Sequence, residues 1–194
     1  MPRQKKLEKS HITKNAMKLF WKKGYHQTSV QDLVDQIGIN RASLYEMYDG
    51  KEGLFKESFL HYTNKVNKKI NLIFNNCESV KSGFDDLINF IVDDLLKNRN
   101  GCLISNSYAE LLPTESNISK TLVQTRNIWV SQILHILNVA KKNNELIDSN
   151  CDLESISNAL YMSITGICTI SKTKVDKRNL KFTLDLFKNK ILFK

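Results

Sequence analysis

Residues that break regular structure are scarce in this sequence, which contains two prolines and seven glycines among 194 residues. Because both residue types interrupt helices, their scarcity favours long helices with short connections. No stretch alternates apolar and polar residues with the period of two that predicts a strand, and no repeat or low-complexity linker is present. The sequence therefore predicts an all-α fold of about nine helices.

The sequence motifs of common enzyme classes are also missing. There is no HExxH, GxSxG, Walker loop or glycine-rich dinucleotide turn, and the four histidines lack metal-ligand spacing. The cysteines form no CxxC pair, which favours reduced thiols over a structural zinc site. They are Cys77, Cys102, Cys151 and Cys168. We expect neither metal nor cofactor and no enzymatic activity, and an enzyme with a basic surface is the weaker alternative.

Long apolar runs are absent as well. A helix needs about 20 predominantly apolar residues to span a bilayer, and no segment approaches that length. The first residues also lack the apolar core of a signal peptide. These absences predict a cytoplasmic protein without a membrane partner.

Positive charge is abundant, and much of it lies at the N-terminus. The net charge is +9, and residues 1–24 carry eight Lys or Arg against one acid, a local net of +7. An excess of this sign favours an anionic partner without identifying it. By itself such a lysine run is most often a solvated helix face. Directly before a DNA-reading motif, contact with phosphates explains it better.

The stretch from Thr28 to Lys51 has the pattern of such a motif. Ser29 is placed to cap a first helix, with Asp32 as its capping-box partner. Gly38 ends that helix, because glycine adopts a positive φ without steric cost. Asn40 can then cap a second short helix. Two short helices around a glycine turn predict a helix-turn-helix, whose second helix fits the major groove of DNA.

Residues 12 to about 62 resemble the N-terminal DNA-binding domain of the TetR family of transcriptional regulators. The features that match, in order, are Leu19-Phe20, Gly24-Tyr25, Thr28-Ser29, the run GINRASLY at residues 38–45, and Lys51-Glu52-x-Leu54. The resemblance implies a ligand-responsive regulator, by family default a repressor, that binds a palindromic operator as a homodimer. It covers about a quarter of the chain closely, and the rest matches only in length and helical character.

The resemblance and the chemistry of the grooves together predict the residues that contact DNA. Arg41, at the start of the second helix, can bind guanine O6 and N7 together. By resemblance Tyr45 contacts backbone or bases and Lys51 binds a phosphate, whereas a packing aromatic and a free surface lysine are the alternatives. The expected DNA-binding set is Thr28, Ser29, Arg41, Ala42, Ser43, Tyr45 and Lys51.

The chain departs from the family pattern after Tyr45. Members commonly carry an aromatic residue and then a histidine or tyrosine there, whereas this chain has Glu46 and Met47. Glu46 repels phosphate unless it accepts from cytosine N4 or turns outward, and Met47 cannot make a charged contact. We therefore expect the helix to dock on DNA but the operator to differ from those of relatives.

Apolar periodicity predicts helices throughout the remainder. We expect them at residues 6–23, 51–76, 80–98, 102–112, 115–142, 152–171 and 177–192, in addition to the two of the helix-turn-helix. Residues 1–50 form the predicted DNA-binding domain and residues 51–76 the connector. Residues 77–194 form the predicted ligand-binding and dimerisation domain.

The last two helices are expected at a dimer interface. Small residues among aliphatic ones permit close helix approach, and in proteins that resemble this one these helices pair with their copies as a four-helix bundle. The expected interface residues are Ile156, Leu160, Ser163, Ile167, Leu180, Leu184 and Phe187. An ordinary intrachain core is the alternative, and two-fold symmetry of helix-turn-helix proteins favours the dimer.

A small-molecule effector is implied by the resemblance, with a mixed apolar and polar set of candidate contacts. The set is Phe90, Cys102, Tyr108, Trp129, Ile133 and Met162. The stretch GCLISNSYAEL at residues 101–111 resembles a TetR subgroup that includes the N-ethylmaleimide reductase repressor, a sensor of electrophiles. A thiol at a helix N-terminus gains thiolate character, which makes Cys102 a candidate sensor. The alternative is that each of these residues packs in the core.

A helical adaptor with a basic face is the competing function. It would bind protein, nucleic acid or membrane through charge alone and would respond to no effector. Specific binding to duplex DNA at rising salt separates the two functions, because a merely basic surface loses all DNA alike.

Overall fold

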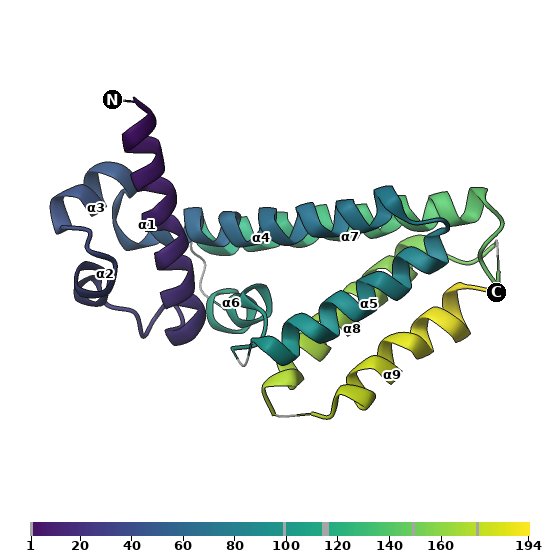
Figure 1. Cartoon of the computed structure of the whole chain (residues 1–194). Coiled ribbons are helices and arrows are strands. Elements are labelled where there is room, and N and C mark those ends of the chain that lie inside the picture. The colour runs from purple at the N-terminus through teal and green to yellow at the C-terminus, as the bar shows by residue number, and fades with distance from the viewer. Residues whose placement is uncertain (1, 99, 114–116, 149, 174) are drawn as a thin grey trace. The chain divides into compact units, whose positions relative to one another are not determined.

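The computed structural model describes residues 2–98, 100–113, 117–148, 150–173 and 175–194, with side chains from residue 9 onward (Figure 1). Within this part of the chain there are nine α-helices, as the sequence predicts. They are α1 (Pro2–Lys23), α2 (Val30–Ile37), α3 (Arg41–Tyr48), α4 (Gly50–Asn76), α5 (Val80–Lys97), α6 (Leu103–Leu111), α7 (Asn117–Lys142), α8 (Leu153–Ile170) and α9 (Lys177–Phe187). The expected start of the seventh helix, Glu115, lies outside the described residues.

The chain divides into two compact units. Unit 1 comprises residues 1–67 and 106–122, and unit 2 comprises residues 68–105 and 123–194. The helices α4, α6 and α7 therefore each run from one unit into the other. The sequence places a boundary near residue 50 and gives no sign that residues 106–122 belong with the N-terminal helices.

The core of unit 1 is aromatic and is built on the buried stripe of α1. Ile12, Ala16, Leu19 and Phe20 are all buried, which confirms the spacing that predicted this helix. The ring of Phe20 meets Phe55 of α4 edge to face at 5.1 Å between centroids. Leu33 of α2 and Leu44 of α3 are completely buried, so both short helices are anchored by one leucine each.

The caps that the sequence predicts in unit 1 are confirmed. The Ser29 hydroxyl accepts from the Asp32 backbone N–H, and the Asp32 carboxylate accepts from the Ser29 N–H, so the capping box is complete. Gly38 ends α2 with φ of 76°. The Asn40 side chain accepts from the Ser43 N–H at 2.8 Å and caps α3. These contacts fix both ends of the helix-turn-helix turn.

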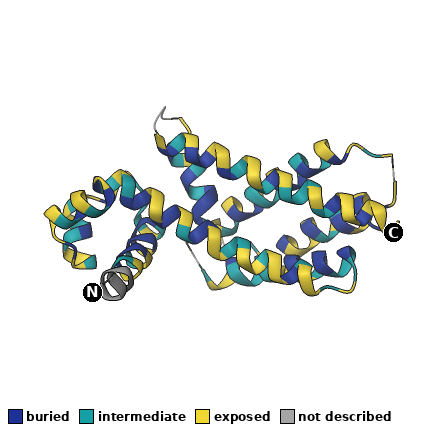
Figure 2. Cartoon of the chain, turned by 90° about the horizontal axis from the view of Figure 1, so that it is seen from above, coloured by how far each residue is buried: buried dark blue, intermediate teal, exposed yellow. Residues whose placement is uncertain are grey.

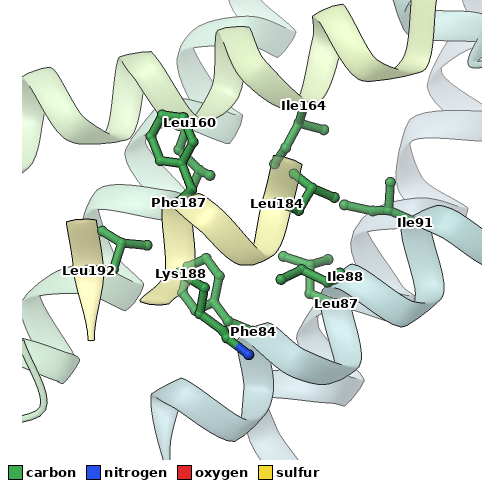
Figure 3. Close-up of a pocket in the computed structure, with 10 residues that line it drawn as sticks. All are labelled: Phe84, Leu87, Ile88, Ile91, Leu160, Ile164, Leu184, Phe187, Lys188 and Leu192. Atoms are coloured by element: carbon green, nitrogen blue, oxygen red, sulfur yellow. The ribbon is translucent and has the colours of Figure 1, made fainter. Parts of the chain in front are cut away.

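Unit 2 is held together by a core between α5, α8 and α9. Figure 3 shows aliphatic and aromatic side chains from these helices converging on one point, among them Leu87, Leu160 and Leu184. The space that remains between them is only about 10 Å³, so this core is close-packed. Its one charged member is Lys188, whose ammonium pairs with Asp85 and also lies 3.7 Å from Asp185. In both units burial follows one side of the helices (Figure 2).

Two details of unit 2 differ from the predictions. The last helix is α-helical only to Phe187, and a π-helical turn, η2 (Lys188–Leu192), follows it. The chain then pairs with the loop after α7 through an isolated antiparallel bridge between Leu146 and Phe193. This bridge places the Phe193 side chain in the core, where it is 1% exposed. Neither feature has a periodic sequence signal, because each depends on a long-range contact.

Among the described residues, no helix is both long enough and apolar enough to cross a bilayer.

Candidate nucleic-acid interface

The outward face of α3 carries most of the side chains expected to read DNA. Arg41 and Ala42 are exposed, and the Tyr45 ring is 59% exposed. On the opposite side of the helix Leu44 and Tyr48 are buried in the core of unit 1. The helix thus offers a cation, a small residue and a phenol on one face, which is the set of groups that a recognition helix needs.

Arg41 is supported by a neighbour on α2. Its guanidinium donates to the Gln31 side-chain oxygen at 3.3 Å, and both side chains are exposed. A guanidinium has five N–H donors, so this contact leaves donors for a base edge. Gln31 was not expected at the site, and its place four residues before Asp35 gives no signal beyond helix periodicity. It adds a polar side chain from α2 to the exposed face.

Other expected contacts lie where they have internal partners. Ser43 is half-buried, and its backbone N–H donates to the Asn40 cap of α3. The Thr28 side chain is completely buried, and its hydroxyl donates to the Gly24 carbonyl at 2.6 Å. Ser29 is exposed, and its hydroxyl donates to the Asp32 carboxylate at 2.8 Å. The start of α2 therefore presents an ordered turn rather than two unengaged hydroxyls.

Asp32 is held as a carboxylate. Lys23 donates to it at 2.7 Å, and this contact together with the N–H and hydroxyl of Ser29 lowers the pKa of Asp32 from 3.8 to about 2. The pair joins the last turn of α1 to the first turn of α2. It fixes the angle at which α2 leaves the preceding turn.

Lys51 is engaged within unit 1. Its ammonium donates to the Tyr25 carbonyl at 3.0 Å and to the Thr28 carbonyl at 2.9 Å. It also lies 4.2 Å from the centroid of the Tyr25 ring, a cation–π distance. Burial lowers the pKa of Lys51, while the charge of Glu110 acts in the opposite direction. An ammonium has three N–H donors, of which these two carbonyls take two.

The two residues that depart from the family pattern lie on different sides of α3. Glu46 is exposed and Met47 is half-buried. The carboxylate therefore turns outward beside the reading face, and the methionine contributes to packing.

Lysines of α1 supply further positive charge. Lys14, Lys18 and Lys22 follow one another at intervals of four and are all exposed, so they share one face of the helix. Lys9 lies 4.0 Å from Glu57 and above the Tyr48 ring. The side chains of Arg3, Lys5 and Lys6 lie outside the described residues.

The six residues expected to bind an effector are divided between the two units. Tyr108 belongs to unit 1, and the other five belong to unit 2. There Met162 is 61% exposed, Ile133 and Phe90 pack against the core, and Trp129 meets Tyr161 edge to face.

A cavity of about 650 Å³ lies elsewhere in unit 2, between the end of α4, the start of α5 and α7. It is lined by Asn71, Phe74, Asn75, Cys77, Val80, Asn127, Ile128, Ser131, Gln132, His135, Ile136 and Val139. The lining contains amides, one hydroxyl, one thiol and one imidazole over an apolar floor. It contains no Asp, Glu, Lys or Arg.

Cys102 lies just before α6 and forms a pair with Cys168 of α8. The two thiols are hydrogen-bonded, and this contact and burial raise the pKa of Cys168 well above its ordinary value. Cys102 is half-buried and packs against the hydrophobic cluster that contains Cys168. Among the described residues no group of three His, Cys, Asp or Glu side chains is placed to hold a metal ion.

Most residues expected at the dimer interface contribute to the core of a single chain. Leu160, Ile167, Leu180 and Leu184 are each at most 8% exposed, while Ile156, Ser163 and Phe187 are half-buried. The apolar residues that α8 and α9 do expose are Met162, Ile170, Phe182 and Leu186. Helical periodicity identified these helices as apolar but did not identify their outer face.

Comparisons with known proteins agree with the helix-turn-helix geometry. Residues 12–58 match the family model described as bacterial regulatory proteins, tetR family. The uncharacterized HTH-type transcriptional regulator YezE of Bacillus subtilis is 27% identical over 188 residues, which cover 96% of this chain and 97% of that protein. The HTH-type transcriptional repressor ComR of Escherichia coli is 28% identical, covering 85% of this chain and 80% of that protein.

Solved structures share the fold at low sequence identity. A cysteine-substituted variant of the TetR family transcriptional regulator CifR, complexed with a 26-bp operator duplex, superposes with a TM-score of 0.80 at 19% identity over 94% of this chain and 95% of that chain. The reduced form of Escherichia coli NemR gives 0.81 at 13% identity, covering 95% and 96%. These likenesses show the fold, an N-terminal helix-turn-helix domain followed by a helical C-terminal domain.

Proposed function

We infer that this chain, which belongs to the TetR family of bacterial regulatory proteins through its N-terminal domain, represses transcription as a ligand-responsive homodimer on a palindromic operator. The observation that carries DNA recognition is the outward face of α3, where Arg41, Ala42 and Tyr45 are exposed on a helix capped at both ends. Phosphate contacts come from the lysine face of α1, with Ser29 at the start of α2 and Ser43 on the reading helix itself.

Two of the expected DNA contacts have a narrower role in this proposal. The Thr28 side chain is buried and its hydroxyl is bonded to the Gly24 carbonyl, so Thr28 acts by shaping the turn before α2. The Lys51 ammonium, already bonded to two carbonyls, has one donor for a phosphate and otherwise holds the same turn. Both residues thus support the position of the reading helix.

The homodimer forms through the exposed apolar face of α8 and α9 in this proposal. Met162, Gly166 and Ile170 are spaced by four residues and share one face of α8, and Phe182 and Leu186 have the same spacing on α9. Exposed apolar patches of this kind mark association sites, and a two-fold dimer matches two half-sites on DNA.

Sedimentation of a matched pair of variants tests the dimer. Phe182→Asp places a charge on the proposed interface and should yield monomers, whereas Leu72→Asp, on an equally exposed residue of α4, should leave the dimer intact. Loss of the dimer in both variants, or in neither, would contradict this assignment of the interface.

The effector is an uncharged molecule in this proposal, bound in the cavity between α4, α5 and α7. Its volume of about 650 Å³ is within the range of small-molecule sites, roughly 300–1,000 Å³. The lining supplies amide donors and acceptors over an apolar floor and no opposite charge for an ionic ligand. Cys102 offers a second trigger, because it is half-buried and lies beside the protonated Cys168 thiol.

Selection of bound fragments from genomic DNA, followed by titration at rising salt, tests the function. A regulator should retain a specific fragment over random DNA as salt increases, because base contacts persist while phosphate contacts weaken. Equal loss of specific and random DNA would instead support the helical adaptor. Two release tests then separate the triggers. Release of the selected fragment by neutral compounds supports the cavity, and release by N-ethylmaleimide in wild type but not in Cys102→Ser supports Cys102.

A further inference from the structure

The turn between α1 and α2 carries backbone groups that no helix satisfies. Gly24 begins it with φ of 86°, after its N–H has closed the last bond of α1 to the Phe20 carbonyl at 2.8 Å. Within the turn the Thr28 N–H donates to the Tyr25 carbonyl at 3.2 Å. The N–H groups of Tyr25 and His26 lie in this turn and need acceptors from outside it.

Glu110 supplies those acceptors from α6, 85 residues further along the chain. One carboxylate oxygen accepts from the Tyr25 N–H at 2.9 Å and the other from the His26 N–H at 2.6 Å. A carboxylate that accepts two adjacent amides forms short, charge-assisted hydrogen bonds with a fixed direction. A Cβ at position 24 would lie 3.0 Å from the same carboxylate, and the φ of 86° there also favours glycine.

Lys51 holds the other side of the same turn. Its ammonium donates to the carbonyls of Tyr25 and Thr28, so a cation binds the turn's carbonyls while an anion binds its amides. Burial raises the pKa of the Tyr25 hydroxyl, and the charges of Glu52 and Glu110 raise it further, while Glu110 opposes the lowering of the Lys51 pKa by burial. The turn leads directly into Ser29 and the capping box of α2.

The helix that carries Glu110 belongs to both units. Its residues 103–105 lie in unit 2 and residues 106–111 in unit 1. In unit 2 the first turn is tied to α8, because the Ser105 hydroxyl donates to the Thr165 carbonyl at 3.4 Å and Cys102 contacts Cys168.

We propose that Glu110 is a positioning residue for DNA binding, which fixes the α1–α2 turn and through it the orientation of the helix-turn-helix. Operator affinity then depends on where α6 holds this carboxylate. This inference rests on the proposed function, because it assumes that α3 reads DNA.

Binding to the selected genomic fragment by three variants tests the proposal. Glu110→Ala removes both acceptors and should weaken operator binding about tenfold, as expected for loss of charge-assisted bonds. Glu110→Gln keeps the size and one acceptor oxygen and should give an intermediate loss. Glu57→Ala removes the same charge from an exposed site of unit 1 and should bind as tightly as wild type or more tightly, because fewer acids repel phosphate.

Hydrogen exchange supplies a readout that a general loss of stability would not imitate. In Glu110→Ala the amides of Tyr25 and His26 should exchange faster, while amides in the middle of α4 and α5 keep their protection. Unchanged exchange at these two amides, or operator affinity equal to that of Glu57→Ala, would overturn the proposal. If wild type itself selects no specific fragment, the proposed function fails instead.

Discussion

The positions of the helices were equally predictable in unit 1 and unit 2, but the exposed faces of those helices were not. In unit 1 the caps of the two helix-turn-helix helices are tied to neighbours three residues away, Ser29 to Asp32 and Asn40 to Ser43. In unit 2 the outer and inner faces of α8 and α9 are decided by packing against α5. Local hydrogen bonds therefore predict the ends of the helix-turn-helix helices, whereas the exposure of side chains in unit 2 follows from contacts between residues that are distant in sequence.

A pair of glycine substitutions, one in each unit, should show the largest difference in stability. In unit 1 a Cβ at Gly53 would lie 1.6 Å from the Tyr48 carbonyl oxygen, so the backbone of α4 or the end of α3 must move. We expect Gly53→Ala to destabilise the protein by about 3 kcal/mol or more. Denaturant unfolding followed by circular dichroism measures the change.

Gly166 of α8 is the matched control. No heavy atom lies within 4 Å of a Cβ built there, so Gly166→Ala should stabilise the helix by about 0.5–1 kcal/mol. If the α8 face also requires close approach of a second chain, the same variant should weaken the dimer in sedimentation. Equal destabilisation by both substitutions would show that Gly53 has no special constraint.

Leu160 and Phe182 test which face of the last two helices is internal. Leu160 was expected at a dimer interface but is 3% exposed within one chain, so Leu160→Ala should cost about 3 kcal/mol of folding free energy. Phe182 is 66% exposed, and Phe182→Ala should leave the stability of the single chain nearly unchanged while weakening association. Unfolding at low protein concentration measures the first effect, and sedimentation measures the second.

Particular residues show which features of the structure the sequence pattern does not predict. Helical periodicity places Leu160 and Phe182 on apolar helices, but which of them faces outward depends on α5, which the pattern does not include. Thr28 occupies the expected position, yet its hydroxyl closes a turn instead of facing solvent. Glu110 lies inside the stretch that drew attention to Cys102, and nothing local relates it to an amide 85 residues earlier. Contacts between distant segments were the information that the sequence pattern lacked.

Substitution of Arg41 tests the DNA-reading face of α3 that the local sequence predicts. Arg41→Ala should weaken specific operator binding by about 2 kcal/mol, roughly thirtyfold, if the guanidinium reads a guanine. Arg41→Lys should recover little of this loss, because a lysine cannot make the bidentate contact. Fluorescence anisotropy with specific and random duplexes measures both variants.

Lys14→Ala serves as the control for a phosphate contact. It should weaken binding to both duplexes alike and reduce the salt dependence, because Lys14 is exposed on the lysine face of α1. Recovery of full specificity by Arg41→Lys would mean that Arg41 acts only as a charge.

The smallest expected effect compares the caps of α2 and α8. Both Asp32 and Asp152 have a lowered pKa, so each folded state favours the carboxylate, and the stability gained is present above the ordinary pKa. For Asp32 that stability is lost as the pH falls from 3.8 through about 2. Accordingly, Asp32→Asn and Asp152→Asn should each destabilise the protein at neutral pH, and the difference from wild type should shrink in acid.

Salt should then distinguish these two caps, because their acceptors differ in kind. The largest cause of the lowered Asp32 pKa is the ammonium of Lys23, whereas Asp152 accepts from the Ser155 hydroxyl and from neutral backbone amides. Raising the salt from about 0.1 M to 1 M shortens the screening length to about 3 Å and should reduce the effect of Asp32→Asn more than that of Asp152→Asn. Denaturant unfolding measures both effects. If the two variants show equal salt dependence, Lys23 contributes no charge interaction to the cap of α2, and that cap depends on neutral hydrogen bonds alone, as the cap of α8 does.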